Sequence, residues 1–202
     1  MANAHTIPTG THGRYLVEPG PAERLLVGFH GYGENADVNL AAMLKIPGIE
    51  RWTVAAVQGL HRFYMVKTGE VVASWMTKQD RELALADNRE YVRGVLNALP
   101  TPERLVFLGF SQGVPMAYRA AAAHPHAAGV IALGGDLPAD VAPAALPPVL
   151  IARGARDEWY SGEKFKKDLS FLPGATVVEL DAGHEWTEAF SGEAGKFLGR
   201  VG

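Results

Sequence analysis

The sequence predicts an α/β domain in which helices cover both faces of a mostly parallel central sheet. Two observations indicate this fold class. Short apolar runs alternate along the chain with longer segments of helical character, as βαβ units require. One run, residues 24–29, is apolar almost throughout, which is typical of a strand buried on both faces. With 202 residues, of which 48% are hydrophobic, the chain can bury the core of one domain.

Seven runs bounded by Gly, Pro or polar residues are predicted strands. The first is closed by Pro19-Gly20-Pro21, and we expect it at an edge of the sheet. The predicted strands cover residues 14–19, 24–29, 52–57, 105–110, 129–133, 149–152 and 176–180.

Five longer segments are predicted helices. The first ends at Pro47-Gly48, and the second has apolar residues near helical spacing and stops at Pro100. Residues 61–79 show no clear periodicity, so we assign no element there. The predicted helices cover residues 35–46, 80–99, 112–124, 162–171 and 185–198.

Composition narrows the possible partners and the cellular location. We expect an N-terminal extension over residues 1–13, without the charge and apolar pattern of a signal peptide, and a single domain over residues 14–202. The net charge of −3 and the lack of a basic stripe argue against a nucleic-acid partner. No apolar stretch is long enough to predict a membrane span. These features favour a cytoplasmic protein.

The residue types also exclude several chemistries. The chain has no cysteine, which rules out a thiol nucleophile, disulfides and thiolate metal sites. The only close pair of histidines, His124-Pro125-His126, has the context of a helix end. We therefore predict no metal site.

The motif Gly109-Phe110-Ser111-Gln112-Gly113 has the pattern of a nucleophile elbow. An apolar strand precedes it and an Ala-rich helix follows it. Side chains at the two glycine positions would collide with neighbouring residues, because the serine must occupy a strained turn. Ser111 is the candidate nucleophile.

Two further polar residues follow late strands at turns that contain glycine. A serine hydroxyl needs a base to take its proton and an acid to orient that base. His184 is the candidate base and Asp157 the candidate acid, which gives the order nucleophile, acid, base. Asp136 also follows a strand, so it remains an alternative acid.

The segment His30-Gly31-Tyr32-Gly33 allows two interpretations. It can form an oxyanion hole, in which the backbone N–H groups of Tyr32 and Gln112 stabilise the developing charge. Residues 31–36 also satisfy the G-x-G-x-x-A fingerprint of dinucleotide-dependent oxidoreductases. Such a site requires an acidic residue at the end of the next strand, which here ends at Gln58-Gly59.

These motifs together resemble the phospholipase/carboxylesterase group of α/β-hydrolases, which includes the acyl-protein thioesterases. The resemblance spans about residues 14 to 200 and includes the segments at residues 30–33, 109–113, 148–157 and 183–184. It implies a hydrolase core with little or no cap domain, a Ser-Asp-His triad, no cofactor, and small-molecule carboxylic ester or thioester substrates.

The chain departs from this group near the expected substrate pocket. Met76-Thr77 follows Trp75 where an aromatic residue and an aspartate are usual, and Asp136 replaces a neutral residue. Candidate pocket residues are Phe63, Tyr64, Trp75, Met76 and Asp136. The aromatic and apolar residues of this set are equally compatible with a hydrophobic plug beneath a loop.

Two classes of function remain from the sequence. The first is a serine carboxylesterase that hydrolyses small to medium esters or thioesters through an acyl-enzyme intermediate. The second is a non-catalytic module with the hydrolase fold that binds an ester or a protein. A binding module is expected to have lost part of the catalytic set, and here every part is present.

Overall fold

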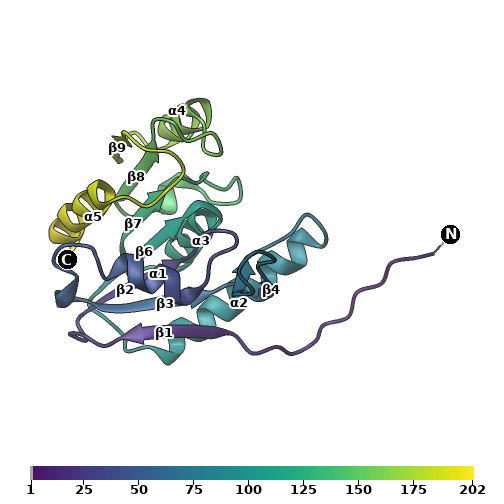
Figure 1. The fold of residues 1–202 in the computed structure, drawn as a ribbon. Coiled ribbons are helices and arrows are strands. Elements are labelled where there is room, and N and C mark those ends of the chain that lie inside the picture. Colours follow the sequence, from purple (N-terminus) through teal and green to yellow (C-terminus); the bar gives the residue numbers. More distant parts are fainter. Residues whose placement is uncertain (1) are drawn as a thin grey trace.

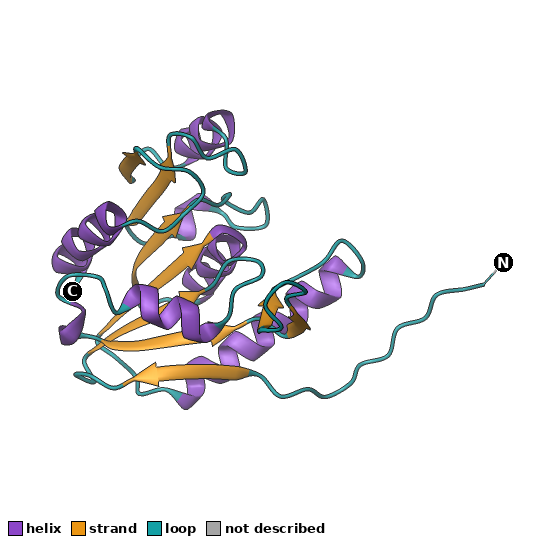
Figure 2. Ribbon diagram, in the orientation of Figure 1, coloured by secondary structure: helices purple, strands orange, loops and turns teal. Residues whose placement is uncertain are grey.

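The computed structural model describes residues 2–202; Met1, the first residue of the predicted N-terminal extension, lies outside the described residues. A seven-stranded sheet forms the centre (Figures 1 and 2), with the strand order β1-β3-β2-β6-β7-β8-β9. Only β1 runs antiparallel to its neighbour, which confirms the predicted mostly parallel sheet. The strands are β1 (Arg14–Glu18), β2 (Arg24–Phe29), β3 (Thr53–Gln58), β6 (Arg104–Phe110), β7 (Ala127–Leu133), β8 (Val149–Gly154) and β9 (Thr176–Leu180).

Helices cover both faces of the sheet, as predicted. One face packs against α1 (Ala36–Met43) and α5 (Glu188–Val201). The other packs against α2 (Arg81–Ala98), α3 (Val114–Ala123) and α4 (Gly162–Phe171). Short 3₁₀ turns are η1 (Ile49–Arg51), η2 (Ser111–Gly113) and η3 (Pro143–Ala145).

The core consists of two layers, one on each side of the sheet. Alternate residues of β6 enter opposite layers: Leu105 and Phe107 pack towards α2 and α3, and Val106 and Leu108 pack towards α1 and α5. Both faces of this strand are therefore buried. This double burial explains why its sequence is continuously apolar instead of alternating.

Three local features differ from the predicted elements. The segment without an assigned element contains a hairpin of β4 (His61–Tyr64) and β5 (Val71–Ser74), which pair with each other and not with the main sheet. The helix predicted from residue 112 starts as the turn η2. The last helix starts at Glu188 because the Thr187 side chain accepts a hydrogen bond from the first turn and caps it there.

The arrangement gathers several loops at one edge of the sheet. The loops that follow the parallel strands β2, β6, β7, β8 and β9 leave from their carboxyl ends, which lie on this edge. Within residues 2–202 we find no separate cap domain. Residues 2–13 form no helix or strand, and they extend away from the sheet in Figure 1.

Candidate active site

The turn after β6 has the strained geometry of a nucleophile elbow. Ser111 adopts φ +51°, in the left-handed region that a residue with a side chain rarely occupies. The surrounding glycines permit this turn: a Cβ at Gly113 would lie 2.1 Å from the Phe29 carbonyl oxygen, and one at Gly109 would lie 2.5 Å from the Gly113 carbonyl oxygen. The backbone packing at both positions therefore requires glycine.

Ser111, His184 and Asp157 form one hydrogen-bonded chain. The Ser111 Oγ lies 2.7 Å from His184 Nε2, and His184 Nδ1 lies 2.7 Å from Asp157 Oδ2. A carboxylate only accepts, so Nδ1 carries the hydrogen and Nε2 is free to accept from the serine hydroxyl. This tautomer allows the imidazole to take a proton from Ser111.

Backbone groups fix the orientation of Asp157, whose side chain is 1% exposed. Its Oδ1 accepts hydrogen bonds from the backbone N–H groups of Trp159 at 2.9 Å and Tyr160 at 2.8 Å. The second oxygen, Oδ2, is thereby left to face His184. The ring of Phe110 lies against the imidazole, with centroids 5.2 Å apart.

A further glycine lets the loop after β7 approach this chain closely. A Cβ at Gly134 would lie 3.2 Å from His184 Cε1 and 3.3 Å from Asp157 Oδ2. Gly134 has φ +66°, so its backbone also favours glycine.

The loop after β2 is held by a buried, neutral histidine. Burial lowers the pKa of His30 to about 4. Its Nδ1 donates to the Gly31 carbonyl oxygen at 2.6 Å, and its Nε2 accepts from the Gly59 N–H at 2.9 Å. His30 thus connects this loop to the end of β3, a role that its place in the motif does not reveal.

Two more contacts fix the same loop. The Gly31 N–H donates to Glu34 Oε2 at 2.8 Å, and burial raises the pKa of the Glu34 carboxyl. The Gly33 N–H donates to the Ala73 carbonyl oxygen in β5 at 3.1 Å, where Gly33 has φ +73°. The loop between these contacts contains the N–H of Tyr32.

The backbone N–H groups of Tyr32 and Gln112 are the candidate oxyanion donors. In the part of the chain that the structure describes, neither donates a hydrogen bond to another protein group. Tyr32 follows β2 and Gln112 follows β6, and these two strands are direct neighbours in the sheet. Preorganised N–H donors of this kind can stabilise an oxyanion by about 3–4 kcal/mol each.

The Gln112 side chain connects the elbow to the segment after β5. Its Oε1 accepts from the Trp75 N–H at 2.9 Å, and its Nε2 donates to the Met76 carbonyl oxygen at 3.1 Å. The Ser74 hydroxyl lies 3.2 Å from the same amide group. These side-chain contacts fix the position of Gln112. The sequence motif does not predict them.

Trp75 is part of the core beneath the loop after β2 and does not line a pocket. Its side chain is fully buried, its ring packs on Phe29, and its indole N–H donates to the His30 carbonyl oxygen at 2.9 Å. Asn88 on α2 donates to the Trp75 carbonyl oxygen at 2.7 Å. Asn88 could have been noticed as a polar residue on the apolar face of the predicted helix.

The other candidate pocket residues differ in their surroundings. Phe63 is half-buried and stacks on Tyr32 with ring centroids 5.5 Å apart, so it lies next to the loop after β2. Tyr64 is 72% exposed, and Met76 is half-buried against the core. Asp136 is exposed and lies 3.6 Å from Lys164 in an ion pair. His184 therefore has Asp157, and not Asp136, as its carboxylate partner.

The residues required by the other chemistries are arranged differently. At the end of β3, where a dinucleotide site needs an acid, Gln58 Oε1 accepts from the Ala36 N–H at 3.4 Å. Among residues 2–202, no group of three or more His, Asp or Glu side chains could hold a metal ion. No helix in the same range is long and apolar enough to cross a membrane.

Comparison of the sequence with protein-family models and with curated proteins gives no match. Comparison of the three-dimensional structure gives clear matches.

Three solved structures illustrate these matches. Esterase PE8 is 20% identical, with a TM-score of 0.75 over 95% of this chain and 100% of its own. Acyl-protein thioesterase 2 from Zea mays is 19% identical, with a TM-score of 0.73 over 94% and 99%. The Bacillus cereus carboxylesterase is 17% identical, with a TM-score of 0.71 over 94% and 95%. These likenesses show that the chain has the α/β-hydrolase fold.

Proposed function

We propose that the protein is a serine carboxylesterase of the phospholipase/carboxylesterase group, which hydrolyses small to medium carboxylic esters or thioesters. The observation that carries the proposal is the hydrogen-bonded chain from Ser111 through His184 to Asp157, with both contacts at 2.7 Å. The names of the structural neighbours, an esterase, a thioesterase and a carboxylesterase, support the same chemistry.

In the first half of the reaction, Ser111 Oγ attacks the carbonyl carbon of the ester while His184 Nε2 takes the hydroxyl proton. The carbonyl oxygen becomes an oxyanion and accepts hydrogen bonds from the N–H groups of Tyr32 and Gln112. Asp157 stabilises the imidazolium. His184 then returns the proton to the departing alcohol or thiol, which leaves an acyl group on Ser111.

In the second half, water replaces the alcohol as the attacking group. His184 takes a proton from the water, and the resulting hydroxide attacks the acyl carbonyl carbon. The same two N–H groups donate hydrogen bonds to the new oxyanion. Collapse of the tetrahedral intermediate releases the carboxylic acid, and the proton on His184 returns to Ser111 Oγ.

The surroundings of the site favour a small to medium substrate. The half-buried Phe63 on β4 stacks on Tyr32, so an apolar wall adjoins the proposed oxyanion hole. We therefore propose that short and medium acyl chains are preferred over long ones.

The test is hydrolysis of p-nitrophenyl esters of increasing acyl length, alongside a matched thioester series. We expect turnover by the wild type and a loss of several orders of magnitude in Ser111→Ala. Ser170→Ala is the matched control and should keep its activity, because Ser170 is exposed and its hydroxyl donates to the Lys167 carbonyl oxygen in its own helix. Saturable ester binding without turnover would instead identify a non-catalytic binding module.

A further inference from the structure

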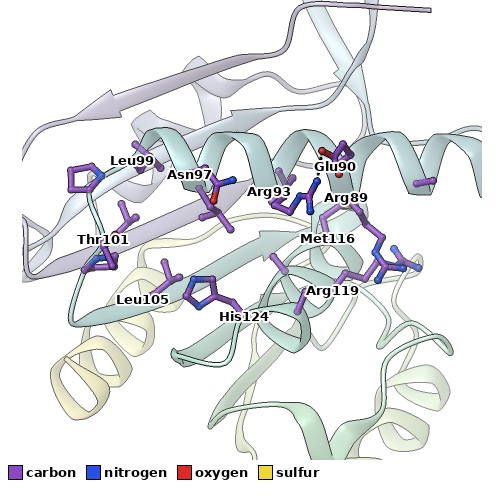
Figure 3. Close-up of a pocket in the computed structure, with 18 residues that line it drawn as sticks. Arg89, Glu90, Arg93, Asn97, Leu99, Thr101, Leu105, Met116, Arg119 and His124 are labelled. Carbon is purple, nitrogen blue, oxygen red and sulfur yellow. Dashed lines mark hydrogen bonds and ion pairs between the residues drawn. The ribbon is translucent and has the colours of Figure 1, made fainter. Parts of the chain in front are cut away.

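A groove of about 600 Å³ lies between α2 and α3 (Figure 3). None of Ser111, Asp157 and His184 lines it. Its volume falls within the usual range for small-molecule sites. The mechanism proposed above makes no use of this groove.

The groove combines an apolar floor with a cationic end. The floor contains Val92, Leu96, Leu99, Leu105 and Met116. Figure 3 shows the guanidinium groups of Arg89 and Arg119 gathered at one end, and His124 beside Leu105 towards the other. A ligand that matches this distribution has one charged end and an apolar body.

Arg119 has an unused hydrogen-bond donor in this groove. Its side chain is only 3% exposed, and its Nε and Nη2 donate to Asp140 at 2.8 and 2.7 Å. Its third nitrogen, Nη1, is buried and has no hydrogen-bond partner among the described residues. A buried guanidinium N–H without an acceptor is unfavourable, so an acceptor supplied by a ligand would stabilise it.

The ion pairs leave one excess positive charge at this end. Arg119 is paired with Asp140, and Arg93 is paired with Glu90 at 2.6 Å. Arg89 forms no ion pair with any described residue, although its charge contributes to the lowered pKa of the Asp140 carboxyl, after the larger effect of the Arg119 hydrogen bond. The excess of one cation fits a monoanion.

A second buried polar atom lines the distant part of the groove. His124 Nδ1 has no hydrogen-bond partner among the described residues. The apolar floor runs between this histidine and the arginines. Along α2, the groove extends from Arg89 to Leu99, which corresponds to about 15 Å at the helical rise of about 1.5 Å per residue.

We propose that the groove binds an amphipathic carboxylate. The carboxylate accepts hydrogen bonds from Arg89, as guanidinium groups favour. It reaches Nη1 of Arg119 once neighbouring side chains move aside, because this atom is buried. The aliphatic chain lies on the floor formed by α2 and α3. This binding needs no turnover at Ser111, so the inference stands apart from the proposed esterase activity.

The experiment measures decanoate binding by isothermal titration calorimetry, below the concentration at which decanoate forms micelles. We expect saturable binding of one molecule per chain. Arg89→Gln removes the unpaired cation from an exposed position and should weaken binding at least tenfold. Leu96→Asn, on the apolar floor, should weaken it by a similar factor. Arg81→Gln lies on the same helix outside the groove and is the matched control, with unchanged binding.

A second arm separates this groove from the catalytic site. Protein whose nucleophile has been blocked with a fluorophosphonate should bind decanoate as the untreated protein does. Loss of binding after this treatment would place the carboxylate at the catalytic site and overturn the proposal. An absence of saturable binding, or equal affinity in Arg89→Gln and wild type, would overturn it as well.

Discussion

Replacing Asp157 by asparagine should move the ring hydrogen of His184 from Nδ1 to Nε2. The same replacement at Asp136 should not, so the two variants distinguish the candidate acids. Oδ1 of Asp157 accepts from two backbone N–H groups, those of Trp159 and Tyr160. In Asp157→Asn, only the amide oxygen can keep these two hydrogen bonds. The amide NH₂ must then occupy the position of Oδ2 and point at His184 Nδ1.

This orientation disables the base. His184 Nδ1 must accept from the amide, so the imidazole hydrogen moves to Nε2, which faces Ser111 Oγ at 2.7 Å. An Nε2 that carries a hydrogen cannot take the serine proton. We expect kcat to fall about 10⁴-fold, as for the loss of this tautomer in serine proteases, which corresponds to about 5 kcal/mol of transition-state stabilisation.

Asp136→Asn is the matched comparison, because it makes the same chemical change in the other candidate acid. The Asp136 side chain is 53% exposed and is paired with Lys164. We expect this variant to retain at least about a tenth of the wild-type kcat, with any larger effect on KM. The assay is p-nitrophenyl ester hydrolysis at saturating substrate. Greater loss of kcat in Asp136→Asn than in Asp157→Asn would refute the assignment of the acid.

Three further predictions concern the loops around the site. Tyr32→Phe should leave kcat nearly unchanged, because Tyr32 is expected to act through its backbone N–H and not its phenol. Gly33→Val should lower kcat at least about tenfold, because Gly33 has φ +73°, which valine rarely adopts. A hundredfold loss of kcat in Tyr32→Phe would show that the hydroxyl participates. Burial lowers the pKa of His30 from 6.5 to about 4. As the pH falls, His30 therefore takes up a proton in the unfolded chain before it does so in the folded protein. This difference should lower the free energy of unfolding by about 3 kcal/mol between pH 6.5 and 4. Urea titrations should show a smaller pH-dependent loss in His30→Gln, and an equal loss would contradict this. Tyr160→Phe removes a 2.8 Å hydrogen bond to the buried Asp168 and should lower the urea-derived stability by about 1–2 kcal/mol, whereas unchanged stability would show that this bond contributes nothing.

The main sheet could be predicted because its physical signal is local. Strands such as β6 are buried on both faces and therefore continuously apolar, and turns with Gly and Pro mark their ends. The β4–β5 hairpin escaped prediction because its strands are short and lie outside the main sheet. Tyr64 in β4 and Val71 in β5 are exposed, so the hairpin lacks the apolar pattern that identified the other strands.

The candidate site was predictable to the extent that strand ends and glycines define it. Ser111, Asp157 and His184 each follow a strand, and parallel strands bring their carboxyl ends to one edge. The support around them was not predictable, because it depends on contacts between side chains and distant backbone. Gln112 binds the segment 74–76, which is nearly forty positions away, and no local pattern encodes that contact. Trp75 could equally have faced a pocket, and only the tertiary packing on Phe29 places it in the core.

The nucleophile is tested most directly by labelling the protein with a fluorophosphonate and locating the adduct by peptide mass spectrometry. We expect a single adduct on Ser111, with loss of esterase activity in proportion to labelling. Ser111→Ala should remain unlabelled while keeping its fold by circular dichroism. An adduct on Ser74, Ser161, Ser170 or Ser191, or full labelling with activity retained, would contradict the proposed mechanism.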